Sequence, residues 1–449
     1  MHIMTRTMLF VLVGIVCVLP ARLHAQQEAA TKEQLEEVKG ALDALTESST
    51  TYQGYVDALR KIKVTGYLQP QFRYTDVVNQ VYSIGAFSGG AFPSNTKNMF
   101  QIRRGRLKVT YDNVLTQFVI QIDAIQTGFT TKDAYLSIIE PWTKSLGFQM
   151  GIFDRPFGYE ISYSSSNRET PERSRLFQTI FPGERELGAK LFYAPQMGPL
   201  SFMRADIGIF NGSGPTANEF DNFKDVIGHV AAQFPFEQAN AEVDLGISGY
   251  FGNVRNATKD LFEMGDLPAG GKGFIKTSDT TFFGDGVTRQ YVGADMQFYY
   301  DIPSLGGMIL RGEYITGKQP GSNASTSSPA AQITTAIYKR EFSGWYAYYI
   351  QNIGDHEQIV FKYDVYDPNT KVEASDFTPA SGLTPADIKF STLGLGFIHH
   401  WDDNVKFILY YELVQNEKLE PAKATSASLS PYTDDVRDNV FTFRVQYKF

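Results

Sequence analysis

Cysteine is nearly absent from this chain. Only one of the 449 residues is a cysteine, and this residue, Cys17, lies in an apolar run near the N-terminus. Because the rest of the chain has no thiol, disulfides, catalytic thiolates and cysteine-based metal sites are excluded there.

Other features are also missing. No apolar stretch of about 18 residues follows the N-terminal run, so no transmembrane helix is predicted. The chain carries 41 basic and 49 acidic residues, and an acidic chain without a basic tail is not expected to bind nucleic acid. No Ser–His–acid cluster or paired-carboxylate motif stands out, and the adjacent His399 and His400 would point to opposite faces of a strand. We therefore expect no enzyme, no metal site and no cofactor.

Residues 1–25 have the pattern of a secretory signal peptide. Arg6 gives a positive start, Met8 to Leu19 form an apolar run, and the segment then ends in the small residue Ala25. The sequence predicts cleavage after Ala25, so that the mature chain begins at Gln26. An uncleaved membrane anchor is the alternative, but the apolar run is short for a bilayer.

Residues 26–61 carry apolar or small residues at alternating steps of three and four. These positions are Leu35, Val38, Leu42, Leu45, Ser49, Tyr52, Val56 and Leu59. Such spacing is the seam of a heptad repeat, and it predicts a short oligomerising coiled coil. Gly40 and the polar run 48–51 weaken this seam. A single amphipathic helix that packs on the following domain is the alternative.

From residue 62 to Phe449 the apolar period changes to two. Near the C-terminus, Phe441, Phe443 and Val445 alternate with Thr442 and Arg444, which is the pattern of a tilted membrane strand. Sixteen segments of this kind occur. They begin near Val64, Gln101, Val114, Lys132, Ser145, Leu187, Leu200, Val226, Glu242, Gln290, Gly307, Glu341, Glu357, Lys389, Asn404 and Val440.

The connections between these segments alternate in length. Short turns, such as 112–113 and 141–144, alternate with long loops, such as 75–99 and 154–186, and only the connection 127–130 breaks this rule. A soluble sandwich gives no reason for such alternation, whereas outer-membrane barrels have it. The sequence therefore predicts an all-β transmembrane protein, an antiparallel 16-stranded outer-membrane β-barrel over residues 62–449. Pro70 would place a bulge, or a poorly paired end, in the first strand.

The two faces of the predicted strands differ in polarity. Apolar residues such as Leu107 and Leu409 occupy one face, and charged residues such as Arg104, Arg311 and Lys362 occupy the other. A charge facing lipid at the bilayer midplane would cost about 2–4 kcal/mol, so the charged face must point inward. Sixteen strands are enough to leave an aqueous lumen. We therefore expect the inward charges to face water.

Basic residues gather at two places in this lumen. Closure of the barrel would put the first, second and last strands side by side, and their cations on one wall that attracts anions. Alternatively, these cations only balance acidic partners across the lumen. The loop 154–186 would fold inward as a constriction, or else lie over the rim. The candidate selectivity residues are Arg73, Arg104, Arg106, Lys108, Arg155, Arg168, Arg173, Arg175, Arg185, Arg311, Arg444 and Lys448; Lys63 would join the same wall.

Five motifs, in this order, resemble the phosphate-selective porin O and P family. They are GYLQPQF from Gly66, RRGRL from Arg103, DAYL from Asp133, GIFDRPFG from Gly151 and FPGERELG from Phe181. The resemblance implies a trimeric sixteen-stranded porin, preceded in some members by a periplasmic coiled coil. It also implies an arginine ladder, to which Arg104, Arg106 and Lys108 would belong, and a lysine-rich constriction. The loop 154–186 departs from this pattern because it has no lysine.

Together these features predict a Gram-negative outer-membrane porin that allows passive diffusion of small hydrophilic solutes, with a mild preference for anions such as phosphate. The expected partners are these solutes, the lipid bilayer, further copies of the chain in a homotrimer, and the barrel-assembly machinery, which would recognise the terminal Phe449. The helical segment would lie in the periplasm. A barrel with a mainly structural or adhesive role, exerted through its long loops and coiled coil, is the alternative.

Overall fold

The computed structural model describes residues 32–76, 92–93, 95–215, 218–268, 270–436 and 438–449. The predicted signal peptide, with Cys17, lies outside the described residues. The chain divides into two units, and the boundary between them in the sequence falls between Arg60 and Lys61. None of the helices in the described residues combines the length and the apolarity needed to cross a bilayer.

The first unit contains helix α2 (Lys32–Arg60). The helix runs through the polar stretch 48–51, where the hydroxyl groups of Thr50 and Thr51 donate to the carbonyls of Thr46 and Glu47, one turn earlier. The apolar residues of the predicted seam are exposed in the single chain, Leu42 to 59% and Leu45 to 66%. Pairing of this seam with other copies stays a prediction.

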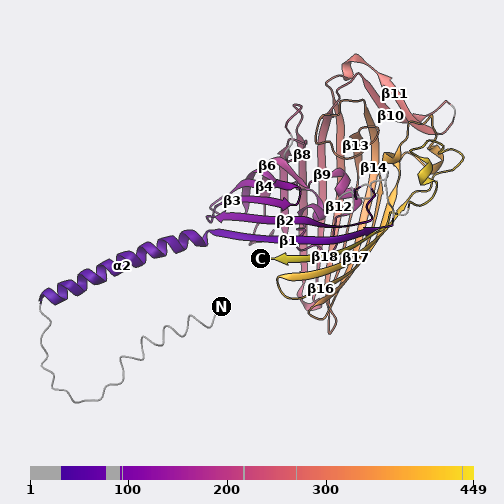
Figure 1. Cartoon of the computed structure of the whole chain (residues 1–449). Coiled ribbons are helices and arrows are strands. Elements are labelled where there is room, and N and C mark those ends of the chain that lie inside the picture. Colours follow the sequence, from indigo (N-terminus) through magenta and orange to yellow (C-terminus); the bar gives the residue numbers. More distant parts are fainter. Residues whose placement is uncertain (1–31, 77–91, 94, 216–217, 269, 437) are drawn as a thin grey trace. The chain divides into compact units, whose positions relative to one another are not determined.

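The second unit is a closed antiparallel barrel, which confirms the predicted fold (Figure 1). Sixteen strands of the described residues form its wall. They are β1 (Ile62–Thr75), β2 (Asn98–Asp112), β3 (Thr116–Ile125), β4 (Gly128–Ile139), β5 (Leu146–Asp154), β6 (Arg185–Tyr193), β7 (Met203–Phe210), β8 (Asp225–Phe236), β9 (Ala241–Arg255), β12 (Gly286–Ile302), β13 (Gly306–Gly321), β14 (Ile337–Ile353), β15 (Glu357–Asp367), β16 (Phe390–His400), β17 (Val405–Asn416) and β18 (Val440–Lys448). Short 3-10 helices occupy Glu237–Ala239, Thr280–Phe282, Ala374–Asp376, Pro385–Asp387 and Ser430–Thr433.

The barrel closes where β1 pairs with both β2 and β18. Beyond β18, the backbone N–H of Phe449 donates to Gly66 at 3.0 Å, and Gly66 donates back at 3.1 Å. A Cβ at Gly66 would meet the carbonyl oxygen of Arg106 at 2.5 Å and the ring of Phe449 at 2.6 Å. Only glycine therefore lets the last residue close against the first strand.

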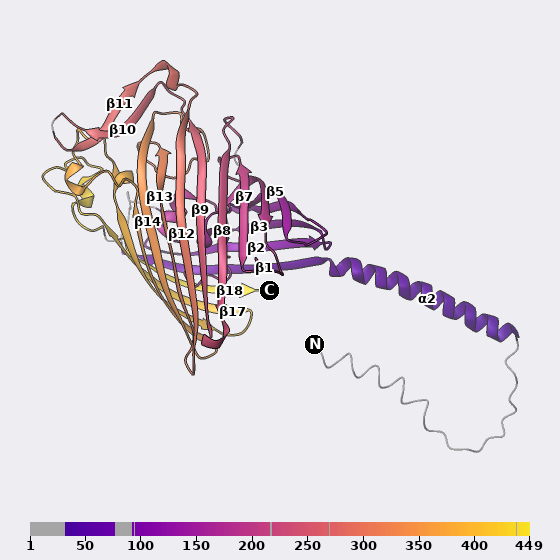
Figure 2. The same cartoon turned by 180° about the vertical axis from the view of Figure 1, so that it is seen from behind.

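The wall alternates as the sequence predicts. Leu107 and Leu409 are more than a third exposed on the outer face, whereas Arg104, Arg311 and Lys362 are buried inside. The wall is also uneven in height. Strands β12 and β14 have 17 residues each, whereas β5 has nine and β7 has eight, and both views show the long strands on one side of the barrel (Figures 1 and 2).

One long loop contains structure that the sequence analysis missed. The connection between β9 and β12 was expected to be a loop, but it folds into the hairpin β10 (Asp260–Asp266) and β11 (Lys272–Ser278). The start of β10 pairs in parallel with β14, at Leu261 and Phe262. The hairpin lies beyond the ends of the wall strands (Figure 2). The glycine-rich turn at 270–271 between two alternating segments was the signal for it.

Candidate functional site: the loop inside the barrel

The connection between β5 and β6 lies inside the barrel. It contains the short helices α3 (Gly158–Ser162) and α4 (Arg175–Ile180). Its polar atoms make hydrogen bonds to inward-facing side chains of eight strands: β1, β2, β9, β13, β14, β15, β17 and β18. A segment that contacts walls on opposite sides of a barrel must cross its lumen, so the predicted inward fold of this loop is confirmed.

One side of the loop is apolar. Phe157, Phe177 and Phe181 are at most 1% exposed and belong to a single buried cluster. The ring of Phe181 lies edge-on to Tyr291 of β12 at 5.8 Å, and the ring of Phe177 lies edge-on to Tyr346 of β14 at 6.1 Å. Each buried aromatic pair adds about 0.5–1.5 kcal/mol beyond the burial of its surface. This aromatic cluster anchors the loop on the wall formed by β9, β12 and β14.

Gly158 makes the turn with which the loop begins. Its φ is +63°, and a Cβ there would meet the Oε1 atom of Glu313 at 2.6 Å. The carboxylate of Glu313 can therefore accept from the backbone N–H groups of Tyr159 and Glu160. The N–H of Gly158 donates to the hydroxyl of Ser248 on β9 at 2.8 Å. Any residue other than glycine would strain the turn and displace Glu313.

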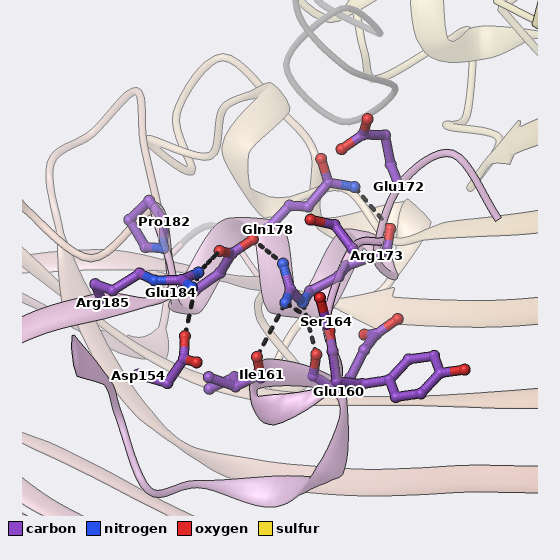
Figure 3. A network of polar contacts seen from close by, with 12 residues as sticks. Asp154, Glu160, Ile161, Ser164, Glu172, Arg173, Gln178, Pro182, Glu184 and Arg185 are labelled. Atoms are coloured by element: carbon purple, nitrogen blue, oxygen red, sulfur yellow. Dashed lines mark hydrogen bonds and ion pairs between the residues drawn. The ribbon is translucent and has the colours of Figure 1, made fainter. Parts of the chain in front are cut away.

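Arg173 holds the loop in its own fold. Its guanidinium donates to the carbonyls of Glu160 at 2.6 Å, Ile161 at 2.9 Å and Tyr163 at 3.2 Å. On its other side it forms an ion pair with Glu184, so the group lies between loop carbonyls and a carboxylate (Figure 3). Since these contacts occupy most of its five N–H donors, Arg173 is a structural residue of the loop.

Arg185 joins the end of the loop to the wall. It contacts Glu184 at 2.5 Å and Asp154 at 3.1 Å (Figure 3). It also contacts Asp133 of β4 at 2.9 Å. Arg155 lies nearby, where it donates to the carbonyls of Pro182 and Arg185. These two arginines close the base of the loop, and Arg155 also lines a cavity beside it.

A bulge in β2 puts two consecutive arginines on the inner face. Gln69 of β1 lies opposite Arg104, but the next residue, Pro70, lies opposite Ile102, so Arg103 is an extra residue in the ladder. Pro70 has no N–H to donate to the ladder, and the irregularity expected beside it is confirmed by a register shift between Gln69 and Pro70, although the extra residue lies in β2 and not in the first strand. The bulge lets Arg103 as well as Arg104 reach into the lumen.

Three arginines converge on one carboxylate of the loop. Glu172 accepts from Arg103 at 2.8 Å, from Arg104 at 2.8 Å and from Arg444 of β18 at 3.2 Å. Burial alone would raise the pKa of Glu172, but the attraction of these three charges outweighs burial and holds the pKa well below its usual range. Glu172 therefore stays ionised and ties the loop to β2 and β18.

Arg168 differs from the other loop arginines. Its side chain is 2% exposed, yet none of its three guanidinium nitrogens has a hydrogen-bond partner among the described residues. Its backbone carbonyl accepts from the ammonium of Lys406 at 3.1 Å, and Lys448 donates to the neighbouring Asn167 at 2.9 Å. Arg168 thus lies in a basic part of the lumen, where the carboxylates of Glu172 and Glu160 attract its guanidinium without accepting a hydrogen bond from it.

The remaining candidate residues contact protein groups in different ways. Arg311 makes two hydrogen bonds to Glu169, and its guanidinium lies over the rings of Tyr159 and Tyr163. Arg106 pairs with Asp123 at 3.4 Å. The guanidinium of Arg73 lies over Phe92, and that of Arg175 lies over Phe390.

A cavity of about 660 Å³ lies between the loop and the wall from β2 to β12. Lys108, a further candidate residue, lines this cavity. The charged lining of the cavity is mixed, with four cations and five carboxylates: Lys108, Arg155, Lys190, Arg204, Asp133, Asp154, Asp206, Asp244 and Asp295. The charges of this cavity therefore favour neither anions nor cations strongly.

The expected basic wall exists, but most of its cations do not face water. Ten of the candidate arginines are at most 6% exposed, because they belong to the loop or contact it: Arg73, Arg104, Arg106, Arg155, Arg168, Arg173, Arg175, Arg185, Arg311 and Arg444. The expectation of water-facing charge was wrong for these residues because it left out the loop as a packing partner. Sequence reasoning also missed Arg103 and Glu172, although the bulge predicted at Pro70 was a signal for Arg103.

Comparison with solved structures finds the same fold in outer-membrane porins. The chain resembles the anion-selective porin from Comamonas acidovorans, with 11% identity and a TM-score of 0.52 over 86% of this chain and 99% of that one. It also resembles OprB of Pseudomonas putida in its high-pH structure, with 10% identity and a TM-score of 0.55 over 88% of this chain and 96% of that one. At these identities the likeness concerns the fold. No protein-family profile and no curated protein matches the chain.

Proposed function

We propose that this chain is a porin of the Gram-negative outer membrane, through which small hydrophilic solutes diffuse passively. The closed barrel with an inward loop supports this function, because such a loop narrows a lumen without filling it. Solutes would pass through the mixed-charge cavity beside the loop. Passive diffusion needs weak binding and quick release, so no cofactor takes part.

We further propose that the pore prefers anions, phosphate among them. The observation that carries this preference is Arg168, whose buried guanidinium lacks a hydrogen-bonding partner in the described residues. An unpaired buried charge is costly, and an anion in the lumen would lower that cost. The resemblance to the phosphate-selective porin O and P family points in the same direction.

The first test is the current through single channels in planar bilayers. A porin gives ohmic steps, and a KCl gradient then gives a reversal potential whose sign identifies the preferred ion. We expect the sign of an anion-preferring pore. The sign of a cation-preferring pore would overturn the preference, and a lack of conductance would favour the alternative, a barrel with a structural or adhesive role.

The second test replaces Arg168 by glutamine. If the charge of Arg168 acts on the permeating ion, its removal lowers the anion-to-cation permeability ratio, by about two- to fivefold for an ion about 4–8 Å away in water. Arg255→Gln is the matched control, because Arg255 lies at the loop end of β9, where its guanidinium contacts Gln332. Equal reversal potentials for both variants would show that Arg168 does not act on the permeating ion.

A further inference from the structure

Along the outer face of β13 and β14, the outward residues change from aromatic to polar to charged towards the loop end, which is the end of the barrel that carries the long loops. Tyr314 lies opposite Trp345, the next outward pair is Thr316 with Ser343, and the pair after that is Lys318 with Glu341. Tyrosine and tryptophan side chains favour the boundary between the hydrocarbon core and the headgroups. At about 3.4 Å per residue, Lys318 lies about 14 Å farther along the strand than Tyr314. This pair of lysine and glutamate is thus at the depth of the headgroups.

A groove of about 550 Å³ lies at this level on the outside of the barrel. We name it the outer groove. Its walls come from the β10–β11 hairpin, from the loop ends of β12, β13 and β14, and from the loop after β15. The charged and polar side chains that line it are Glu263, Asp266, Lys272, Thr288, Lys318, Lys339, Arg340, Glu341 and Lys371.

The hairpin wall of the outer groove is firmly attached. The ring of Phe262 stacks on that of Tyr338, with 4.3 Å between centroids and an interplanar angle of 2°. Phe274 is buried in an apolar cluster with Phe377 and Leu383, and its N–H donates to the carbonyl of Ser381 at 2.8 Å. The groove is therefore a formed cavity and not a gap beside a loose loop.

Two lysines of the outer groove differ from its other cations because they make no ion pair in the part of the chain that the structure describes. Arg340 pairs with the buried Asp387 at 2.7 Å, and Lys371 pairs with Glu341 at 3.0 Å. Lys339 pairs with Glu263. By contrast, the ammonium groups of Lys272 and Lys318 make no ion pair with any residue that the structure describes.

We propose that the outer groove binds the phosphate-bearing headgroup of a lipid in the outer leaflet. The groove opens on the outer face of the wall, it lies at headgroup depth, and its two free ammonium groups match a phosphorylated headgroup. The inference rests on the proposed outer-membrane location, but not on ion conduction. The hairpin thereby gains a role as one wall of a lipid site.

The test measures binding of lipid to the purified full-length protein in detergent. The probes are a bis-phosphorylated glycolipid of the outer leaflet, its dephosphorylated form and inorganic phosphate, and native mass spectrometry counts the bound molecules. We expect the phosphorylated glycolipid to bind about tenfold more tightly than the dephosphorylated form. The double variant Lys272→Gln/Lys318→Gln should lose this difference.

The matched control is Lys418→Gln/Lys423→Gln, which removes two lysines at the loop end that do not line the groove. Equal affinity for both glycolipids, or an unchanged preference in the groove variant, would overturn the proposal. So would equally tight binding of inorganic phosphate, because the site would then serve a soluble anion. The lipid site and the porin function can fail separately. The proposal predicts that, in bilayers without glycolipid, the groove variant conducts as the native channel does.

Discussion

At the scale of single residues, the arginines inside the barrel have two different tasks. The N–H groups of Arg173 and Arg185 donate to carbonyls and carboxylates that belong to the loop or its base. Arg103, Arg104 and Arg444 share the one carboxylate of Glu172. Arg168, by contrast, makes no hydrogen bond through its guanidinium to any residue that the structure describes, so this group is available to an ion in the lumen. The number of arginines is therefore a poor measure of selectivity.

Glu172→Gln tests this division. The change removes the negative charge shared by three arginines and keeps the shape of the side chain. Their charge then acts on the lumen, so the anion-to-cation permeability ratio should rise about two- to fivefold. Reversal potentials in a KCl gradient measure this ratio. Glu219→Gln is the control, since Glu219 pairs with Lys224 in the loop between β7 and β8; a ratio that stays constant in Glu172→Gln contradicts the prediction.

At the scale of elements, the loop between β5 and β6 is held from two sides by different forces. Its aromatic cluster packs on the wall of β9, β12 and β14, whereas its carbonyls and Glu172 bind polar and charged side chains of β17, β18, β1 and β2. The ion pair of Glu172 with Arg104 is buried, with each side chain 3% exposed, so salt screens it weakly. Both sides should therefore help to hold the loop in place.

Phe181→Ala should loosen this element. Truncation of a buried phenylalanine costs about 3–5 kcal/mol, because it removes apolar contacts and leaves a cavity. The loop should then leave its place more often, and single-channel records should show larger mean conductance and more noise. Phe283→Ala is a suitable control, since Phe283 is 62% exposed at the loop end. Records of Phe181→Ala that match the native channel would show that the aromatic cluster does not hold the loop.

At the scale of the whole molecule, a single copy of the chain leaves an apolar helix surface exposed. The seam of α2 is exposed in the single chain over its length, from Leu35 to Leu59. Exposed apolar seams of this kind are buried when helices pair, and coiled coils do so with regular contacts between equivalent positions. We therefore expect copies of this chain to associate through α2, as the predicted homotrimer requires.

The scarcity of cysteine makes this association easy to test. The only cysteine, Cys17, lies in the predicted signal peptide, so the mature chain offers a background without thiols. Leu45→Cys would place sulfur atoms of neighbouring copies within the short range that a disulfide needs, whereas Ala44→Cys lies outside the seam. After oxidation, non-reducing gels should show linked chains for Leu45→Cys only. Equal linking of both variants, or none, would contradict a seam at these positions.

The sequence by itself determined the wall of the barrel. Each strand repeats one local rule, because neighbouring side chains must meet lipid and lumen in turn, and this rule can be read without knowledge of distant contacts. Hence the sixteen strands, the pairing of the first strand with the last and the irregular pairing at Pro70 were predictable.

Only the tertiary structure decided what the lumen contains. The partners of Arg104, Arg311 and Arg444 come from the loop between β5 and β6, far away in the sequence, and no local pattern specifies such pairs. The hairpin of β10 and β11 escaped prediction because it is short and lies within a long connection. Local alternation fixes which way a side chain points, but whether it meets water, an ion or another residue depends on how the loop folds back into the barrel.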